Sequence, residues 1–275
     1  MRLRSVLYMP ASNSRAIAKA RELPCDAVVL DLEDAVAPEQ KEAARAQAVA
    51  ALTEGGFGER TVVVRINGLD TEWGADDAAA VRAVAAAVLL PKVDGPAELA
   101  RARALLGPRP ALWAMVETCA GVLALPALAP AAKAHGLGAL VVGTNDLAKE
   151  MRCRMDAART PMLPVLTQVV VAARAAGIMA LDGVCNALDD PERLAAEAHQ
   201  GAMLGFDGKT LIHPAQIDAA NAAFGPTADE VAWARSVVAA FAYPANADKG
   251  AVRLDGAMIE RLHLADAARI LAALA

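Results

Sequence analysis

The stretch Val28-Val29-Leu30-Asp31-Leu32-Glu33-Asp34 passes directly from a purely apolar run into three carboxylates. A short run of β-branched and aliphatic residues is typical of a strand that is buried on both faces of a parallel sheet. Similar runs recur along the chain, and a segment long enough for a helix separates most of them. The predicted strands are residues 5–10, 26–34, 61–67, 84–93, 111–118, 138–144, 178–184 and 201–213.

Alternation of strands with helices predicts βαβ units and a parallel sheet. We expect helices at residues 38–52, 95–106 and 191–198, where Pro or Gly marks the ends. Eight strands in 275 residues favour a closed (β/α)8 TIM barrel of the α/β class, which usually takes about 250 residues. An open doubly wound sheet is the alternative, although no G-x-G-x-x-G follows the first strand.

Two domains are expected. Residues 1–225 would form the catalytic barrel, and residues 226–275 would form a C-terminal helical extension or lid. In this extension we expect a helix at 228–242, an irregular segment rich in Pro, Asn and Gly at 243–256, and a last helix at 257–275.

Composition excludes several classes of partner. The net charge is −5 and the basic residues are spread along the chain, which argues against nucleic acid. The apolar runs are interrupted before they reach the length of a membrane span, so we expect no membrane partner. The four cysteines have no paired spacing and the N-terminus does not resemble a secretion signal, which predicts a cytoplasmic protein.

Charged residues end many of the predicted strands, on the side where α/β barrels carry their active sites. Charges gathered at one mouth are costly unless they are paired or bind a metal ion. A hard cation resolves this conflict, with Mg²⁺ as the first choice, Mn²⁺ as the alternative, and Glu117 and Asp146 as first-choice ligands. The alternative is a salt bridge of Glu117 with Arg65 or Lys92 and no metal.

The other strand-end residues suggest supporting roles. Arg65 offers fixed donors to a developing enolate oxygen, or else is a permanent partner of Glu33. Glu33 and Asp34 could orient metal-bound water or hold Arg65, whereas Asp31 could equally cap or pair at the end of its strand. His213 could meet a phosphate or ribose, or be an ordinary loop histidine.

The same strand ends carry motifs of a known family. They are Arg4 to Pro10 with Asn13 and Arg15, Leu30 to Pro38, Val64 to Asn67, Leu90 to Val93, Glu117-Thr118, Gly143 to Leu147 and Gly208 to Pro214. In this order, over nearly the whole chain, the sequence resembles the citrate lyase β-subunit-like group of the HpcH/HpaI aldolase/citrate lyase superfamily. That group includes malyl-CoA and citramalyl-CoA lyases.

The resemblance implies that Glu117 and Asp146 bind Mg²⁺ and that Arg65 contacts a carbonyl or enolate oxygen of a thioester. It also implies an oxo-acid-lyase reaction, in which a 3-hydroxyacyl-CoA is cleaved to an acyl-CoA and a 2-oxoacid, or the reverse synthesis. Asn13, Arg15, Lys92 and His213 are then candidates for substrate binding. The family implies a homotrimer or larger assembly, in which the C-terminal arm covers a neighbouring subunit's site.

Two positions depart from the family pattern. Glu260 stands where the family has an aspartate as the acid/base group, and small displacements of such a group can cost about 100-fold in rate. Ala11 replaces the glycine that follows Pro10. We therefore weigh an acyl-CoA lyase against a citrate lyase β subunit acting on an acyl-carrier-protein thioester, a CoA-independent metal aldolase, and a CoA-binding protein without activity.

Overall fold

The computed structural model describes residues 2–246 and 248–274, so the predicted boundaries at residues 1 and 275 lie outside it. The chain divides into two compact units, one formed by Leu3–Phe224 and the other by the residues from Gly225 onward, with Arg2 assigned to the second. Within the described ranges, the helices are all too short or too polar to cross a membrane.

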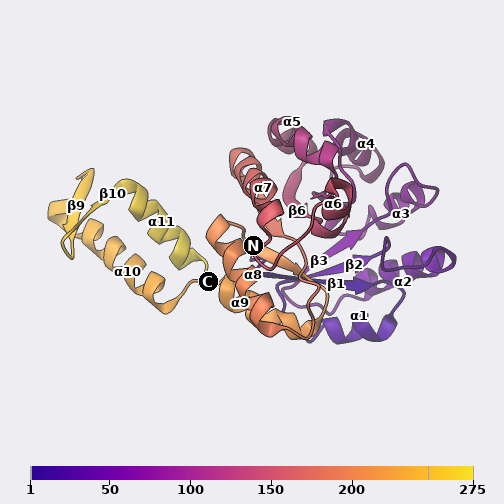
Figure 1. The fold of residues 1–275 in the computed structure, drawn as a ribbon, viewed down its shortest axis with the longest axis horizontal. Coiled ribbons are helices and arrows are strands. Elements are labelled where there is room, and N and C mark those ends of the chain that lie inside the picture. The colour runs from indigo at the N-terminus through magenta and orange to yellow at the C-terminus, as the bar shows by residue number, and fades with distance from the viewer. Residues whose placement is uncertain (1, 247, 275) are drawn as a thin grey trace. The chain divides into compact units, whose positions relative to one another are not determined.

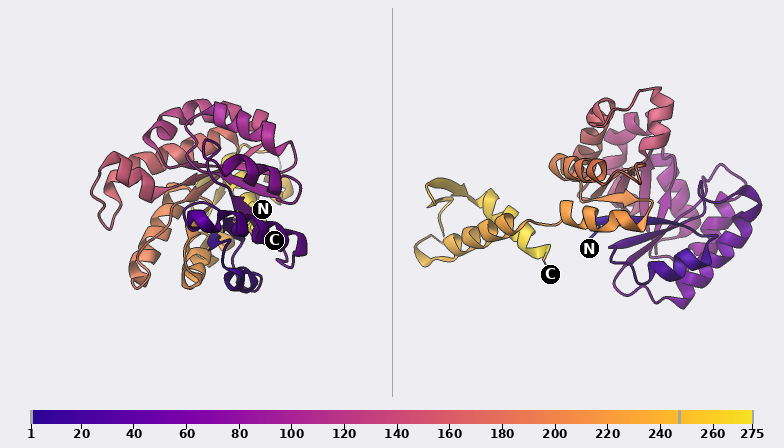
Figure 2. Two further views of the ribbon diagram at one scale, coloured as in Figure 1. Left: turned by 90° about the vertical axis from the view of Figure 1, so that its right-hand side faces the viewer. Right: turned by 60° about the horizontal axis from the view of Figure 1, so that its bottom comes forward.

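The first unit is a closed barrel of parallel strands that follow one another in chain order, with the eighth strand pairing back to the first. Helices surround the strands (Figures 1 and 2). The predicted (β/α)8 fold is confirmed. The strands are β1 (Ser5–Pro10), β2 (Ala27–Asp31), β3 (Thr61–Arg65), β4 (Ala87–Leu90), β5 (Ala111–Val116), β6 (Leu137–Val142), β7 (Met179–Asp182) and β8 (Gly208–Leu211).

The α-helices of this unit are α1 (Ser14–Ala20), α2 (Lys41–Glu54), α3 (Gly74–Val81), α4 (Pro96–Leu106), α5 (Cys119–His135), α6 (Thr144–Met151), α7 (Leu163–Ala176), α8 (Pro191–Leu204) and α9 (Ile217–Ala223). Short 3₁₀ turns, η1 (Pro38–Gln40), η2 (Thr160–Met162) and η3 (Pro214–Gln216), precede α2, α7 and α9. The start of the predicted eighth strand is wrong, because α8 continues to Leu204. Gly205 ends this helix in the left-handed conformation, and β8 begins only at Gly208.

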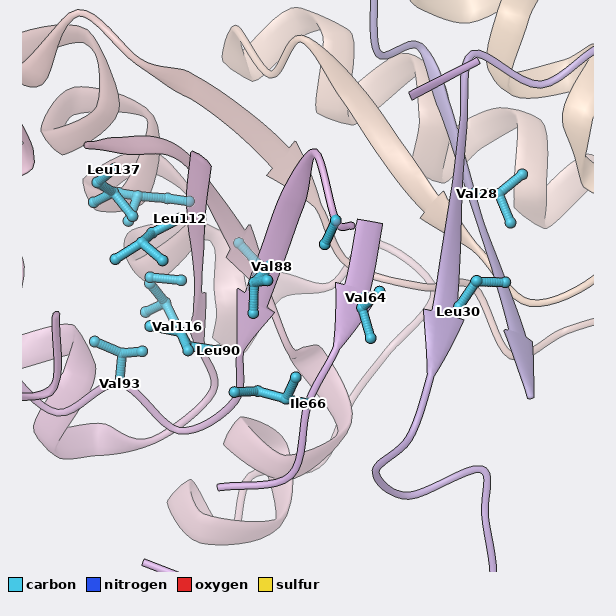
Figure 3. Close-up of a cluster of buried hydrophobic side chains, with 14 of the residues drawn as sticks. Val28, Leu30, Val64, Ile66, Val88, Leu90, Val93, Leu112, Val116 and Leu137 are labelled. Carbon is cyan, nitrogen blue, oxygen red and sulfur yellow. The ribbon is translucent and has the colours of Figure 1, made fainter. Parts of the chain in front are cut away.

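Alternation along the strands builds two apolar layers. Val28 and Leu30 point outward into the layer between sheet and helices, where Val64 and Val88 of the neighbouring strands join them (Figure 3). The intervening Val29 belongs to a separate cluster that fills the barrel interior. Because side chains alternate between the two faces, a charged residue at an interior position near the end of a strand must face the barrel mouth.

The second unit contains α10 (Ala228–Ala242), η4 (Pro244–Asn246), the antiparallel strands β9 (Ala251–Leu254) and β10 (Ala257–Glu260), and α11 (Arg261–Ala272). Its own core includes Val237, Phe241 and Ile259. The predicted helix at 257–275 is therefore wrong in its first turn. Asp255 and Gly256 both adopt positive φ, 50° and 85°, and an Asp-Gly pair of this kind connects hairpin strands.

A network of buried charges joins the last two strands of the barrel, from the end of β7 to the start of β8. Lys209 is fully buried, and its Nζ contacts Asp182 Oδ2 at 3.0 Å and the Gly183 carbonyl oxygen at 2.6 Å. Arg159, which precedes η2, donates from Nη1 to both Asp182 oxygens at 2.8 and 2.9 Å. The Asp182 carboxylate therefore ties the closing strands to the segment before α7.

Candidate active site

A cavity of about 320 Å³ opens at the carboxyl ends of the strands, where sequence reasoning placed the site. Its walls combine apolar side chains with carboxylates and one guanidinium. It is lined by Tyr8, Asp31, Asp34, Ala35, Arg65, Met115, Glu117, Val142, Gly143, Thr144, Asn145, Asp146, Val184, Thr210 and Ile212. Such a pocket suits a small polar ligand that carries an apolar portion.

Arg65 is the buried cation of this cavity, and β3 directs it inward from the same face as Val63. Its Nε and Nη2 donate to Asp31 Oδ1 and Oδ2 at 2.7 and 2.6 Å, in a two-pronged ion pair. Its Nη1 lies 2.8 Å from Glu33 Oε2. The guanidinium also stacks on the Tyr8 ring, 5.1 Å from the ring centre. It is thus held on three sides before any ligand arrives.

Asp31 is the principal partner of Arg65, a role that sequence reasoning left open. Residues 31 and 65 are register partners on neighbouring strands, so their side chains lie side by side. The Asp31 carboxylate also accepts from the backbone N–H groups of Glu33 and Ala35 at 2.9 and 3.2 Å. It therefore both caps the loop after β2 and fixes the guanidinium, which combines the two roles that the sequence allowed.

Glu33 bridges the two cations of the mouth. Its Oε1 accepts from Lys92 Nζ at 2.9 Å, while its Oε2 contacts Arg65 without hydrogen-bond alignment. Burial raises the pKa of Glu33, and the two cations oppose that rise. Burial lowers the pKa of Lys92, but the hydrogen bond with Glu33 and the negative charges of Glu33 and Glu117 together outweigh burial and leave the pKa raised. Asp34 is more peripheral, exposed and 3.7 Å from Arg65 Nη1.

Lys41 supports this loop from behind. Its buried Nζ donates to the carbonyl oxygens of Leu32 and Glu33 at 2.8 and 2.7 Å, and to Asn67 Oδ1 at 2.7 Å. All three ammonium hydrogens therefore have acceptors. Sequence reasoning missed this residue, because a lysine at the first position of a helix ordinarily points into solvent.

Glu117 follows β5 at an interior position and is 3% exposed. Its Oε1 accepts from the Lys92 backbone N–H at 2.8 Å. Within residues 2–246 and 248–274, no arginine or lysine side chain forms an ion pair with it, so the alternative of a simple salt bridge is wrong. Burial, followed by the charge of Glu33, raises the pKa of Glu117 to about 7.

Asp146, in the first turn of α6, lines the same cavity on the neighbouring strand end. Lys92 connects the two carboxylates, because its backbone N–H binds Glu117 and its Nζ lies 3.5 Å from Asp146 Oδ2. Lys92 holds this position with a φ of 48°, a conformation that non-glycine residues rarely adopt. Strain of this kind often occurs at functional sites.

Gly143 makes room for the Glu117 carboxylate. A Cβ at position 143 would lie 2.6 Å from Glu117 Oε2, so only glycine lets this side chain occupy its place. The donor set therefore fits a hard divalent cation. Two carboxylates, one of them buried and without a counter-ion, converge on a cavity with room for water and a ligand. Among the described residues, no cluster of three or more His, Cys, Asp and Glu side chains provides a complete protein cage.

Asn13, Arg15 and His213 are not among the residues that line this cavity. Asn13 is exposed and caps α1 by accepting from the Ala16 N–H, and Arg15 is exposed on the same helix. His213 is exposed and accepts from the Ala215 N–H through Nδ1 at 3.2 Å. Glu260 belongs to the second unit, where it precedes α11 and its backbone N–H donates to His263 Nδ1 at 2.9 Å. Their roles in binding or catalysis stay predictions.

Known proteins resemble this chain over most of its length. The family described as HpcH/HpaI aldolase/citrate lyase matches residues 4–214. A (3S)-malyl-CoA thioesterase from Cereibacter sphaeroides (strain KD131) is 46% identical over 270 residues, which cover 98% of this chain and 93% of that protein. Citrate lyase subunit beta from Escherichia coli K12 is 34% identical, with 94% and 88% covered.

Solved structures agree with these relatives. Mycobacterium tuberculosis CitE in complex with magnesium, acetoacetate and coenzyme A is 31% identical, with a TM-score of 0.79, and the match covers 98% of this chain and 97% of that one. The citrate lyase beta subunit from the same organism, complexed with oxaloacetate and magnesium, is 33% identical, with a TM-score of 0.71 and coverage of 82% and 100%.

Proposed function

Because the chain belongs to the HpcH/HpaI aldolase/citrate lyase family, as its motifs predicted, we propose that it is a Mg²⁺-dependent enzyme for 3-hydroxyacyl-CoA thioesters such as malyl-CoA or citramalyl-CoA. The observation that carries the proposal is Glu117, a buried carboxylate without an ion-pair partner in the described part of the chain. The magnesium, coenzyme A and malyl-CoA in the names of its relatives support this cofactor and substrate class.

Glu117 and Asp146 would hold the cation, with Mn²⁺ as a possible substitute. A cation bound there would act as a Lewis acid toward the oxygen atoms of the substrate. Arg65 needs no rearrangement to act beside it, because Asp31 and Glu33 already fix the guanidinium. Preorganised donors of this kind stabilise charge without a reorganisation cost during the reaction.

The reaction that we propose first is cleavage of the carbon–carbon bond. A base removes the proton of the 3-hydroxyl group, and the bond between C2 and C3 breaks as the C3–O bond becomes a carbonyl. The electron pair moves onto the thioester oxygen, where Arg65 stabilises the enolate. Protonation of the enolate carbon then gives the acyl-CoA, and the other product is the 2-oxoacid.

Glu260 is our candidate for the proton transfer. It occupies the position that the family resemblance assigns to an aspartate, and its side chain is only partly buried. Glu260→Gln is expected to remove the base while leaving cation binding by the barrel unchanged. Glu260→Asp should retain turnover if the shorter side chain still reaches the hydroxyl.

Hydrolysis of the thioester is a second candidate, favoured by the relative named (3S)-malyl-CoA thioesterase. Water would attack the thioester carbonyl, the carbon–sulfur bond would break, and CoA would leave with malate as the acid product. The same cavity and the same Arg65 would serve both reactions, because each places negative charge on the thioester oxygen. The products distinguish them.

The test is to incubate the protein with malyl-CoA or citramalyl-CoA, with Mg²⁺ or EDTA, and to identify the products by mass spectrometry. Acetyl-CoA with glyoxylate or pyruvate would support carbon–carbon cleavage. Free CoA with intact malate or citramalate would support hydrolysis. Glu117→Ala should abolish either activity, whereas Glu59→Ala, at an exposed position, is the matched control.

Absence of turnover on every CoA ester would contradict the proposal. An acyl-carrier-protein thioester and free hydroxy-oxo acids would then be the next substrates, as for a citrate lyase β subunit or a metal aldolase. We also propose that copies of the chain assemble as a trimer or larger, with residues 226–275 as a lid. Light scattering on the purified protein tests the assembly.

A further inference from the structure

Tyr8 has no role in the chemistry described so far, although its side chain lines the cavity from β1. The hydrogen bond of its hydroxyl runs from Oη to the Met115 sulfur, Sδ, at 3.8 Å. Thioether sulfur is a weak acceptor, and a buried tyrosine hydroxyl ordinarily finds a stronger one. The phenol therefore remains a donor that a ligand oxygen can recruit.

Arg65 also directs a donor at the Met115 sulfur. Its Nη1 donates to the same Met115 Sδ at 3.7 Å, while Nε and Nη2 are committed to Asp31. The same Nη1 lies 2.8 Å from Glu33 Oε2, but without hydrogen-bond alignment, so its aligned donor contact is the one with the sulfur. Two donors from different strands thus converge on one weak acceptor at the wall of the cavity. Burial raises the pKa of the Tyr8 phenol, so the hydroxyl keeps the proton that it would donate.

We propose that Tyr8 Oη and Arg65 Nη1 form a two-donor site for a single substrate oxygen, and that Met115 Sδ receives both donors when no substrate is present. The inference rests on the proposed function, in which that oxygen belongs to the thioester and becomes negatively charged. Oxygen is a far better acceptor than thioether sulfur, so the substrate would gain two hydrogen bonds at little cost to the protein.

An alternative role for Tyr8 is purely structural, because its ring already stacks on the guanidinium of Arg65. The variant Tyr8→Phe distinguishes the two roles. Phenylalanine keeps the ring and the stacking but removes the donor. Tyr243→Phe makes the same chemical change at the other tyrosine, which is exposed in the second unit, and is the matched control.

The first measurement is binding of oxalate, a small planar dianion, to the Mg²⁺-loaded full-length protein by calorimetry. Tyr8→Phe should bind oxalate about ten-fold more weakly, as loss of a hydrogen bond to a charged oxygen predicts, with unchanged Mg²⁺ affinity. The second is turnover of the thioester, where kcat should fall about 100-fold with little change in KM. Tyr243→Phe should match the wild type in both.

Two Met115 variants test the same site without touching either donor. Met115→Gln places an amide oxygen where the sulfur lies, and this oxygen should capture both donors and compete with the ligand. Met115→Leu is of similar size and offers no acceptor. Oxalate should therefore bind Met115→Gln at least about ten-fold more weakly than Met115→Leu. This comparison decides the matter if Tyr8→Phe does not fold.

Equal oxalate affinity and turnover in Tyr8→Phe and wild type would overturn the two-donor site. Equal affinity of the two Met115 variants, or no binding of oxalate to the wild type, would overturn it as well. If the wild type turns over no thioester but Tyr8→Phe still weakens oxalate binding, the proposed function fails and the two-donor site stands.

Discussion

The ammonium of Lys41 holds Glu33 by its backbone, with 2.7 Å between Lys41 Nζ and the Glu33 carbonyl oxygen. The side chain of the same glutamate contacts both cations at the barrel mouth. A residue outside the cavity thus positions the loop whose carboxylate positions Arg65 and Lys92.

Lys41→Met should destabilise the protein by about 2–3 kcal/mol, because the Glu33 carbonyl and Asn67 Oδ1 lose a buried donor. Urea unfolding measures the effect. Lys19→Met, at an exposed position of α1, is the control and should change stability by less than about 0.5 kcal/mol. A loss below about 1 kcal/mol in Lys41→Met would show that water replaces the ammonium.

Gly143→Ala should weaken binding of Mg²⁺ or Mn²⁺ by about ten-fold or more. The new Cβ would lie within 2.6 Å of Glu117 Oε2, so the carboxylate must move. Titration calorimetry gives the affinity. Gly250→Ala is the control, because a Cβ there meets no atom within 4 Å. Wild-type affinity in Gly143→Ala would mean that Glu117 is not a ligand in its present position.

Glu117→Gln should lose cation binding but gain stability in EDTA, by about 2 kcal/mol at pH 8. Burial raises the wild-type pKa to about 7 from 4.5, so the folded state holds this proton more tightly than the unfolded state. The stability of the wild type therefore falls as pH rises from 4.5 to about 7, whereas the glutamine of the variant does not titrate and contributes no such pH dependence. Unfolding in EDTA at pH 5 and pH 8 checks the sign, and a destabilised variant at pH 8 would contradict it.

Lys92→Gly should be more stable than Lys92→Ala by about 1 kcal/mol, although both lose the ion pair with Glu33. The φ of 48° strains alanine and not glycine. The same pair of changes at Lys133, inside α5, should show the opposite order. If alanine were the more stable residue at position 92, the backbone there would not be strained.

The sequence allowed the barrel and its charged mouth to be predicted, because alternation and strand-end charges are local patterns. Glu33 was expected as a partner of Arg65, and the two side chains are in contact, but the principal partner, Asp31, was not identified. That pairing depends on the register of β2 and β3, which matches Asp31 with Arg65, and a one-residue slip would have replaced Asp31 with a neighbour. Tyr8 escaped notice for a similar reason, because a tyrosine in an apolar strand is ordinarily a core residue.

The second unit shows a different limit of prediction from sequence. Ala257–Glu260 forms a strand in spite of residues that also suit a helix, and α11 follows immediately. The deciding signal was Asp255-Gly256, a two-residue turn that pairs this strand with β9. The helix α10, which contains no such signal, has the predicted bounds 228–242.

The buried ion pair of Asp182 and Lys209 has a consequence for how the barrel opens. β7 and β8 share only the register pairs Leu181↔Gly208 and Asp182↔Lys209, whereas β2 and β3 are paired from Ala27↔Thr61 to Asp31↔Arg65. Charge attraction thus compensates for a short ladder between the last two strands of the barrel. Among the strands of the barrel, amide hydrogen exchange should begin at this ladder, and Asp182→Asn, which removes the charge, should speed exchange there before the rest of the barrel is affected.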